Sequence, residues 1–191
     1  RYAASVRPRG IERIIVRAEP DPRKWLPPRT VGIRMDAQVA VGDARAAEDA
    51  AKTFATYLRY SFTPGAMRSK FEPTRPMKGV GAHMIGIVTA QELRANLGDI
   101  QVAGRTCTEW IDFSIADIER DFLKPEHEVL MEVVGEGGEI LDHFDGRTLL
   151  PGHAMEAAWF IMHEGKLRDD RRLIRVGLNI RVQQRQHHHA R

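Results

Sequence analysis

Five segments of this 191-residue chain place apolar residues at helical spacing, and this pattern limits the fold more than any other feature. Apolar residues that recur every three or four positions predict amphipathic helices. The pattern predicts helices at residues 44–60, 80–96, 106–122, 152–164 and 170–180. Asp43 is placed to cap the first helix, Gly98 ends the second, and Pro125 follows the third. The chain is therefore predicted to be mainly α-helical.

One short β-hairpin is expected before the fourth helix. Residues 128–134 and 139–144 have short apolar strand patterns, and the glycine-rich turn between them is typical of a hairpin. Residues 61–78 contain three prolines and predict a long loop.

The two ends of the chain differ from this helical pattern. Residues 1–36 contain five prolines and no regular apolar spacing, so an irregular Arg/Pro-rich segment is expected there. Residues 181–191 continue nothing in the helical pattern and are expected to form a tail. The domain is therefore predicted to span residues 37–180.

Residues 147–160 carry the clearest chemical signal in the chain. Pro151 and Gly152 break the preceding segment, and the helix formers that follow place His153 in the first turn of a helix. Glu156 lies one turn further along, on the same face. A histidine can take or give a proton near neutral pH, and a nearby carboxylate can orient its ring or hold it charged. The alternative interpretation is an ordinary helix start whose first-turn acid suits the helix dipole.

The surrounding residues favour the chemical interpretation. Residues 149–160 closely resemble the Asn-Pro-Gly-His-x-x-Glu-x-x-Trp stretch of the N-acylglucosamine 2-epimerase family. Residues 129–142 resemble the hairpin that precedes this stretch in the family, and residues 74–79 and 84–94 resemble another family segment. These segments follow one another in the family's order, and the resemblance covers roughly residues 37–180.

The family fold is an (α/α)6 barrel, an α/α toroid of two concentric rings of paired helices. The helices predicted here are about half of those that such a barrel needs. The resemblance therefore implies that the chain forms part of an (α/α)6 barrel.

The resemblance also implies a reaction. Family members move a proton at C2 of a ring-opened sugar with a pair of histidines, and by resemblance His153 is one of the pair, with Glu156 as its neighbour. No counterpart of the second histidine is recognised in this sequence. N-acetylglucosamine, interconverted with N-acetylmannosamine, is the expected substrate. Cellobiose 2-epimerisation, mannose isomerisation and a non-catalytic binding protein on the same fold stay open as alternatives.

Further side chains are candidates for binding the sugar. His83 opens a helix in a region that faces the family's cavity, although such a histidine also suits a helix start or a core. Arg75 and Lys78 lie in a loop from which they could reach a sugar or stay solvated, and Arg147 precedes the His153 motif. Trp159 lies in an apolar run and is interpreted as a core residue rather than a sugar-stacking surface.

Composition and charge argue against several other classes of protein. The formal net charge of +3 combines basic ends with an acidic centre, but no nucleic-acid-binding module is recognisable. No apolar run approaches the length of a membrane-spanning helix. Cys107 is the only cysteine, which excludes an internal disulfide and fits a reducing, cytoplasmic location. We expect no cofactor, no metal, no nucleic acid and no membrane partner; a homodimer is compatible with the sequence.

Overall fold

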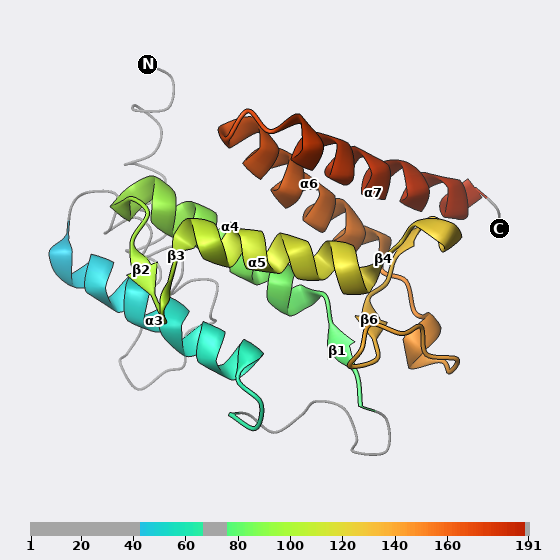
Figure 1. Ribbon diagram of the computed structural model, residues 1–191, viewed down its shortest axis with the longest axis horizontal. Helices are drawn as coiled ribbons and strands as arrows, with labels where there is room; N and C mark the ends of the chain where they lie inside the picture. The colour runs from blue at the N-terminus through green and yellow to red at the C-terminus, as the bar shows by residue number, and fades with distance from the viewer. Residues whose placement is uncertain (1–42, 67–75, 190–191) are drawn as a thin grey trace, which may run out of the picture.

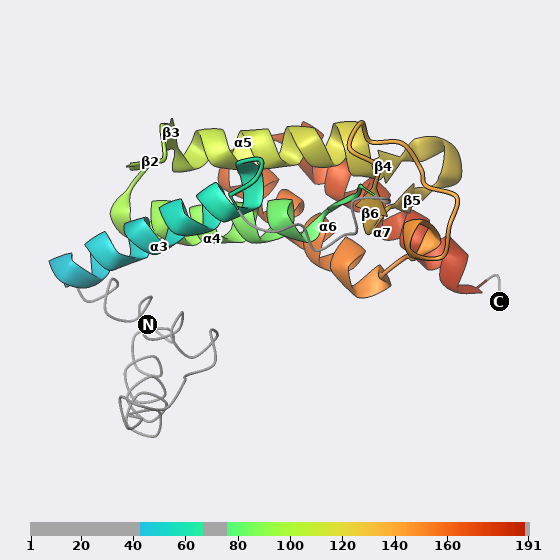
Figure 2. The same cartoon turned by 90° about the horizontal axis from the view of Figure 1, so that it is seen from below.

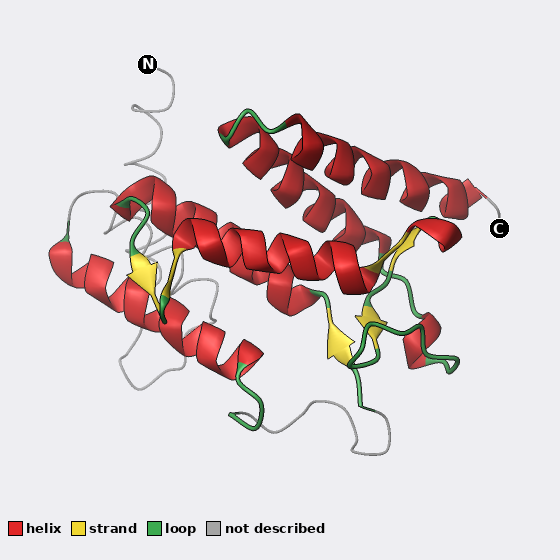
Figure 3. Cartoon of the chain, in the orientation of Figure 1, coloured by secondary structure: helices red, strands yellow, loops and turns green. Residues whose placement is uncertain are grey.

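The computed structural model describes residues 43–66 and 76–189, and these residues are mainly helical (Figures 1 and 3). The α-helices in this part of the chain are α3 (Ala44–Phe62), α4 (Gly81–Leu97), α5 (Cys107–Asp117), α6 (Pro151–Leu167) and α7 (Arg171–His189). A π-helical turn at Ile118–Phe122 extends α5 to the predicted end of that helix. Each predicted helix is therefore found, and the mainly α fold class is confirmed.

Capping side chains explain where two of the helices begin. Asp43 Oδ1 accepts hydrogen bonds from the backbone N–H groups of Arg45 (3.0 Å) and Ala46 (3.1 Å), as its position before α3 predicts. At α5, Thr106 Oγ1 accepts from the N–H of Glu109 at 3.1 Å, and Glu109 Oε2 accepts from the N–H of Thr106 at 2.7 Å. These bonds satisfy N–H groups that a first helical turn leaves without helical partners.

Short strands meet at the two ends of the helices. They are β1 (Lys78–Gly79), β2 (Gln101–Val102), β3 (Arg105–Thr106), β4 (Leu123–Lys124), β5 (Val129–Leu130) and β6 (Val133–Val134). In antiparallel pairs, β2 joins β3, β4 joins β5, and β1 joins β6. Figures 1 and 2 place β2 and β3 at one end of the helices and the other pairs at the opposite end, where α6 begins. Single 3₁₀ turns lie at Pro125–His127 and Asp145–Arg147.

The hairpin expected between residues 128–134 and 139–144 is wrong. Residues 139–144 form no strand, and the N–H of Gly135 donates to the carbonyl of Glu139 at 2.9 Å only to close a turn. β6 pairs instead with β1, which precedes α4. An apolar run predicts that a strand is buried, but it does not say which backbone completes its hydrogen bonds. Here a distant segment of the chain does so.

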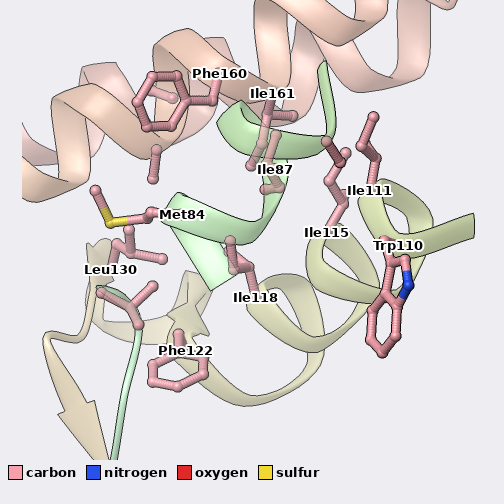
Figure 4. Packing of buried hydrophobic residues seen from close by; sticks show 14 of the residues in the cluster. Met84, Ile87, Trp110, Ile111, Ile115, Ile118, Phe122, Leu130, Phe160 and Ile161 are labelled. Atoms are coloured by element: carbon pink, nitrogen blue, oxygen red, sulfur yellow. The ribbon is translucent and has the colours of Figure 1, made fainter. Parts of the chain in front are cut away.

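The core lies where α4, α5 and α6 meet. Ile87 of α4, Ile111 and Ile115 of α5, and Ile161 of α6 are fully or almost fully buried. Figure 4 shows these side chains gathered in one cluster. Burying each such side chain stabilises the fold by about 1.5–3 kcal/mol. The cluster therefore fixes the mutual positions of the three helices.

A fully buried carboxylate ties α4 to α6. Glu164 Oε2 accepts hydrogen bonds from Gln91 Nε2 at 2.9 Å and from Arg94 Nη2 at 2.8 Å. Its other oxygen binds Arg168, one turn further along the chain. A buried carboxylate without partners would be strongly destabilising, and these donors compensate its lost hydration. The tie holds together two helices whose first turns each carry a histidine.

Helix α7 continues to His189, well beyond its predicted end at residue 180. Residues 181–189, expected to be part of a tail, contain no glycine or proline that would stop a helix. The irregular segment expected at residues 1–36 lies outside the described residues. No α-helix within residues 43–66 or 76–189 combines the length and apolar character needed to cross a bilayer.

Candidate functional site

His153 is the third residue of α6, and its side chain is about half exposed, at 45%. The backbone before the helix is extended at Leu150, and Pro151 occupies the first helical position, which suits its fixed φ and its missing N–H. The predicted position of His153 in a first helical turn is therefore found. Its ring is held at the surface, where a small molecule could reach it.

Glu132 is the carboxylate that contacts His153. Glu132 Oε2 lies 2.9 Å from His153 Nδ1, and the Glu132 side chain is 19% exposed. Glu132 directly precedes β6, and its backbone carbonyl accepts a hydrogen bond from the N–H of Val80 at 3.0 Å. The β1–β6 pairing thus brings this carboxylate to the start of α6.

Sequence reasoning missed Glu132. The residue lies inside a run whose apolar pattern predicts only a strand of the expected hairpin. A signal was present, because Glu132 is a charged residue with apolar neighbours on both sides in residues 129–134. A charge in a half-buried strand needs a partner. The sequence did not reveal that the partner is His153.

The contact assigns a role to each ring nitrogen of His153. An ionised carboxylate can only accept hydrogen bonds, so Nδ1 carries the proton that Glu132 accepts. In a neutral imidazole the lone pair then lies on Nε2. This nitrogen makes no hydrogen bond to any residue that the structure describes. The arrangement can therefore accept a proton at Nε2.

Glu156 is exposed and forms no hydrogen bond or ion pair with His153. Its carboxylate makes no hydrogen bond or ion pair with any described residue. Three residues along a helix correspond to an offset of about 60° around the axis, so the two side chains are neighbours on one surface. The carboxylate within hydrogen-bond distance of His153 is that of Glu132, and Glu156 is left with open acceptor oxygens nearby.

The interpretation of Trp159 as a core residue is wrong, because this side chain is 59% exposed. Its indole lies nearly parallel to the ring of His163, with 6.1 Å between centroids and 14° between planes. Trp159 follows Glu156 by three residues and therefore continues the same exposed surface of α6. The apolar run of residues 157–162 did not reveal this exposure, since its other large side chains supply the buried face.

His83 lies in the core and not on a surface that a sugar could reach. Its side chain is 7% exposed and packs against Phe62, Phe113 and Phe122, with ring centroids 5.1, 5.8 and 5.7 Å away. Burial lowers the pKa of His83 to about 4, although the carboxylate of Asp117, 3.7 Å from Nε2, opposes this shift. This environment agrees with the alternative interpretation from the sequence, in which His83 is a core residue.

The three basic candidates are in different situations. Lys78 Nζ lies 2.6 Å from Asp121 Oδ2, so its charge is already engaged. Hydrogen bonds from Arg120 and from Lys78 lower the pKa of Asp121 to about 2. Arg147 forms an exposed ion pair with Asp142 at 3.0 Å, which a ligand could displace at little cost. Arg75 lies outside the described residues.

The described residues contain no group of three or more histidine, cysteine, aspartate or glutamate side chains arranged to hold a metal ion. Cys107 is buried in the core at the start of α5. At the start of α6, the side chains of His153, Glu132 and Glu156 can transfer protons and form hydrogen bonds.

Comparison with known proteins identifies the family. The family model for N-acylglucosamine 2-epimerase (GlcNAc 2-epimerase) matches residues 33–184, which is most of the chain. A comparison with curated proteins gave no match. The family consists of carbohydrate epimerases, and the mostly helical structure is consistent with part of an α/α toroid. The chain, with a histidine and two acidic residues gathered where α6 begins, belongs to the N-acylglucosamine 2-epimerase family.

Proposed function

We propose that the protein interconverts N-acetylglucosamine and N-acetylmannosamine, with His153 as a proton-transfer group at C2. One observation carries this proposal: the half-exposed ring of His153 has its Nδ1 engaged by Glu132 and its Nε2 open. A base that is oriented on one side and free on the other is what removal of a C2 proton requires. Membership of a sugar 2-epimerase family supports the choice of reaction.

The proposed step begins from the ring-opened sugar. His153 Nε2 takes the C2 proton, the C2–H electron pair forms a double bond to C1, and the C1 carbonyl oxygen gains the negative charge. Return of a proton to the opposite face of C2 gives the epimer. The developing charge needs a donor, and Arg147 is our candidate because its exposed pairing with Asp142 is easily exchanged. The charge of Lys78 is committed to Asp121, so we give it a lesser role.

The exposed surface of α6 next to His153 is the proposed sugar-binding surface. The open carboxylate oxygens of Glu156 can accept hydrogen bonds from sugar hydroxyl or amide groups. The exposed indole of Trp159 can cover the apolar C–H face of a sugar, and its stacking on His163 holds that indole in place. Hydrogen bonding and stacking then come from consecutive turns of one helix.

Deuterium exchange at C2 is the direct test. The protein is incubated with N-acetylglucosamine in D2O, and ¹H NMR follows loss of the C2 proton and appearance of N-acetylmannosamine. We expect His153→Asn to slow exchange by about 10²–10⁴-fold, the range that a positioned acid–base group contributes. His127→Asn is the matched control, because His127 is an exposed histidine of the turn between β4 and β5 to which we assign no role, and this variant should exchange at the wild-type rate.

The alternatives are separated in the same assay. If the C2 proton of cellobiose or mannose exchanges but that of N-acetylglucosamine does not, the proposed substrate is wrong and the proposed role of His153 stands. Equal exchange by wild type and His153→Asn would contradict the catalytic assignment. Sugar binding by calorimetry without exchange on any of these sugars would favour the non-catalytic binding protein.

A further inference from the structure

The contact between Glu132 and His153 links two segments that lie far apart in the sequence. We propose that Glu132 is a positioning residue for His153: its carboxylate holds the proton on Nδ1 and so presents the lone pair of Nε2 to the sugar. This inference rests on the proposed function for its catalytic consequence. Its structural part, the position of the imidazole proton, can be tested without any reaction.

The backbone of Glu132 is fixed by hydrogen bonds around it. Its own carbonyl accepts from the N–H of Val80 at 3.0 Å, and the N–H of Met131 donates to the carbonyl of Phe122 at 2.9 Å. Gly79 faces Val133 in the β1–β6 pair. The carboxylate therefore projects from a segment held by two neighbouring parts of the chain. Such support can hold an imidazole in one orientation.

Glu132 has no competing partner within the described residues. Its only ion pair or hydrogen bond through the side chain is with His153. Lys78, whose strand β1 pairs with β6, directs its charge to Asp121 at 2.6 Å and not to Glu132. The carboxylate is thus free to act on the imidazole alone.

The choice of nitrogen matters because a free histidine side chain carries its proton mainly on Nε2. In that tautomer the nitrogen that faces the sugar would be a donor and could not take a proton. The hydrogen bond made by one ring nitrogen decides where the proton resides. Glu132 reverses the free preference, and Glu156, which forms no hydrogen bond with the ring, cannot do so.

Three variants separate orientation from charge. Glu132→Met keeps the approximate size and removes the acceptor. Glu132→Gln keeps a carbonyl oxygen that can accept from Nδ1 but removes the charge. Glu136→Gln is the matched control, because Glu136 is an exposed glutamate in the turn that follows β6.

Imidazole ¹⁵N shifts give the tautomer of His153 directly. The chain has eight histidines, and the signal of His153 is assigned by its absence in His153→Asn. We expect wild type, Glu136→Gln and Glu132→Gln to carry the proton on Nδ1, and Glu132→Met to carry it mainly on Nε2. Protonation of Nε2 in the wild type at pH 8, with a non-protonated Nδ1, would overturn the inference. Circular dichroism checks that each variant is folded; if Glu132→Met is not, Glu132→Gln and the wild-type tautomer still decide.

Kinetics then test the consequence. We expect Glu132→Met to lower kcat for C2 exchange by about 10–100-fold, a typical effect of removing the group that orients a functional histidine, with KM changed less than kcat. Glu132→Gln should recover most of the loss. An unchanged kcat in Glu132→Met would overturn the positioning role. The tautomer of His153 could change in Glu132→Met while His153→Asn still exchanges C2 protons at the wild-type rate. This result would support the contact between Glu132 and His153 and contradict the proposed function.

Discussion

His83 and His153 occupy the same local position, yet the tertiary structure gives them opposite environments. Each is the third residue of its helix, α4 or α6, and each has a carboxylate nearby. The side chain of His83 is 7% exposed and that of His153 is 45% exposed. His83 Nε2 is 3.7 Å from Asp117, whereas His153 Nδ1 is 2.9 Å from Glu132.

The comparison teaches that burial by neighbouring side chains, rather than position in the helix, separates a core histidine from an available base. Phe62, Phe113 and Phe122 surround His83, and its Nδ1 has no hydrogen-bond partner in the described residues. A charged ring there would lose hydration, so the neutral form is favoured. His153 keeps water on one side and a carboxylate on the other.

The largest effect expected from the difference between His83 and His153 is a decrease in the free energy of unfolding at acidic pH. The pKa of His83 is about 4 in the folded protein and about 6.5 in an unfolded chain, so the unfolded state binds a proton first as the pH falls. Stability contributed by His83 should be fully present above pH 6.5 and decline down to about pH 4. The loss should be on the order of 3 kcal/mol, measured by urea unfolding at several pH values.

His83→Leu isolates this contribution, since leucine cannot titrate. The variant should lose much of the dependence of stability on pH between 6.5 and 4.5. An equally steep loss in His83→Leu would contradict the assignment to His83 and mean that another titratable group causes it.

A second change should make His83 more like His153. Phe62→Ala removes one wall of the aromatic surroundings, at a cost of about 2 kcal/mol for a partly buried ring. Water can then reach His83, and its pKa should rise toward the ordinary value, which can be followed by NMR titration. The loss of stability between pH 6.5 and 4.5 should become smaller in this variant. An unchanged pKa would show that Phe62 is not part of what excludes water.

The smallest effect concerns the exposed side of α6. Trp159→Ala should change the free energy of unfolding by less than about 1 kcal/mol, because the indole is largely exposed. A core tryptophan would cost about 3–5 kcal/mol, so thermal or urea unfolding separates the two environments clearly. If Trp159 contacts the sugar as proposed, KM should rise in the same variant.

Much of the fold could be predicted because helices are local. The predicted helices, the Asp43 cap and the first-turn position of His153 all follow from residues within a few positions of one another. The partner of β6 could not be predicted, since α4 and α5 lie between β1 and β6 in the sequence. The missed role of Glu132 has the same origin: its position depends on the β1–β6 pair.

The sequence by itself determined the helices, the family and the histidine at the start of α6, because spacing and capping act over short stretches of chain. Only the tertiary structure decided that His83 is enclosed, that Trp159 is exposed and that Glu132 is the carboxylate on His153. Exposure and long-range contacts depend on which surfaces meet. A helical pattern shows that a helix has an apolar side, but the packed neighbours decide which of its side chains water still reaches.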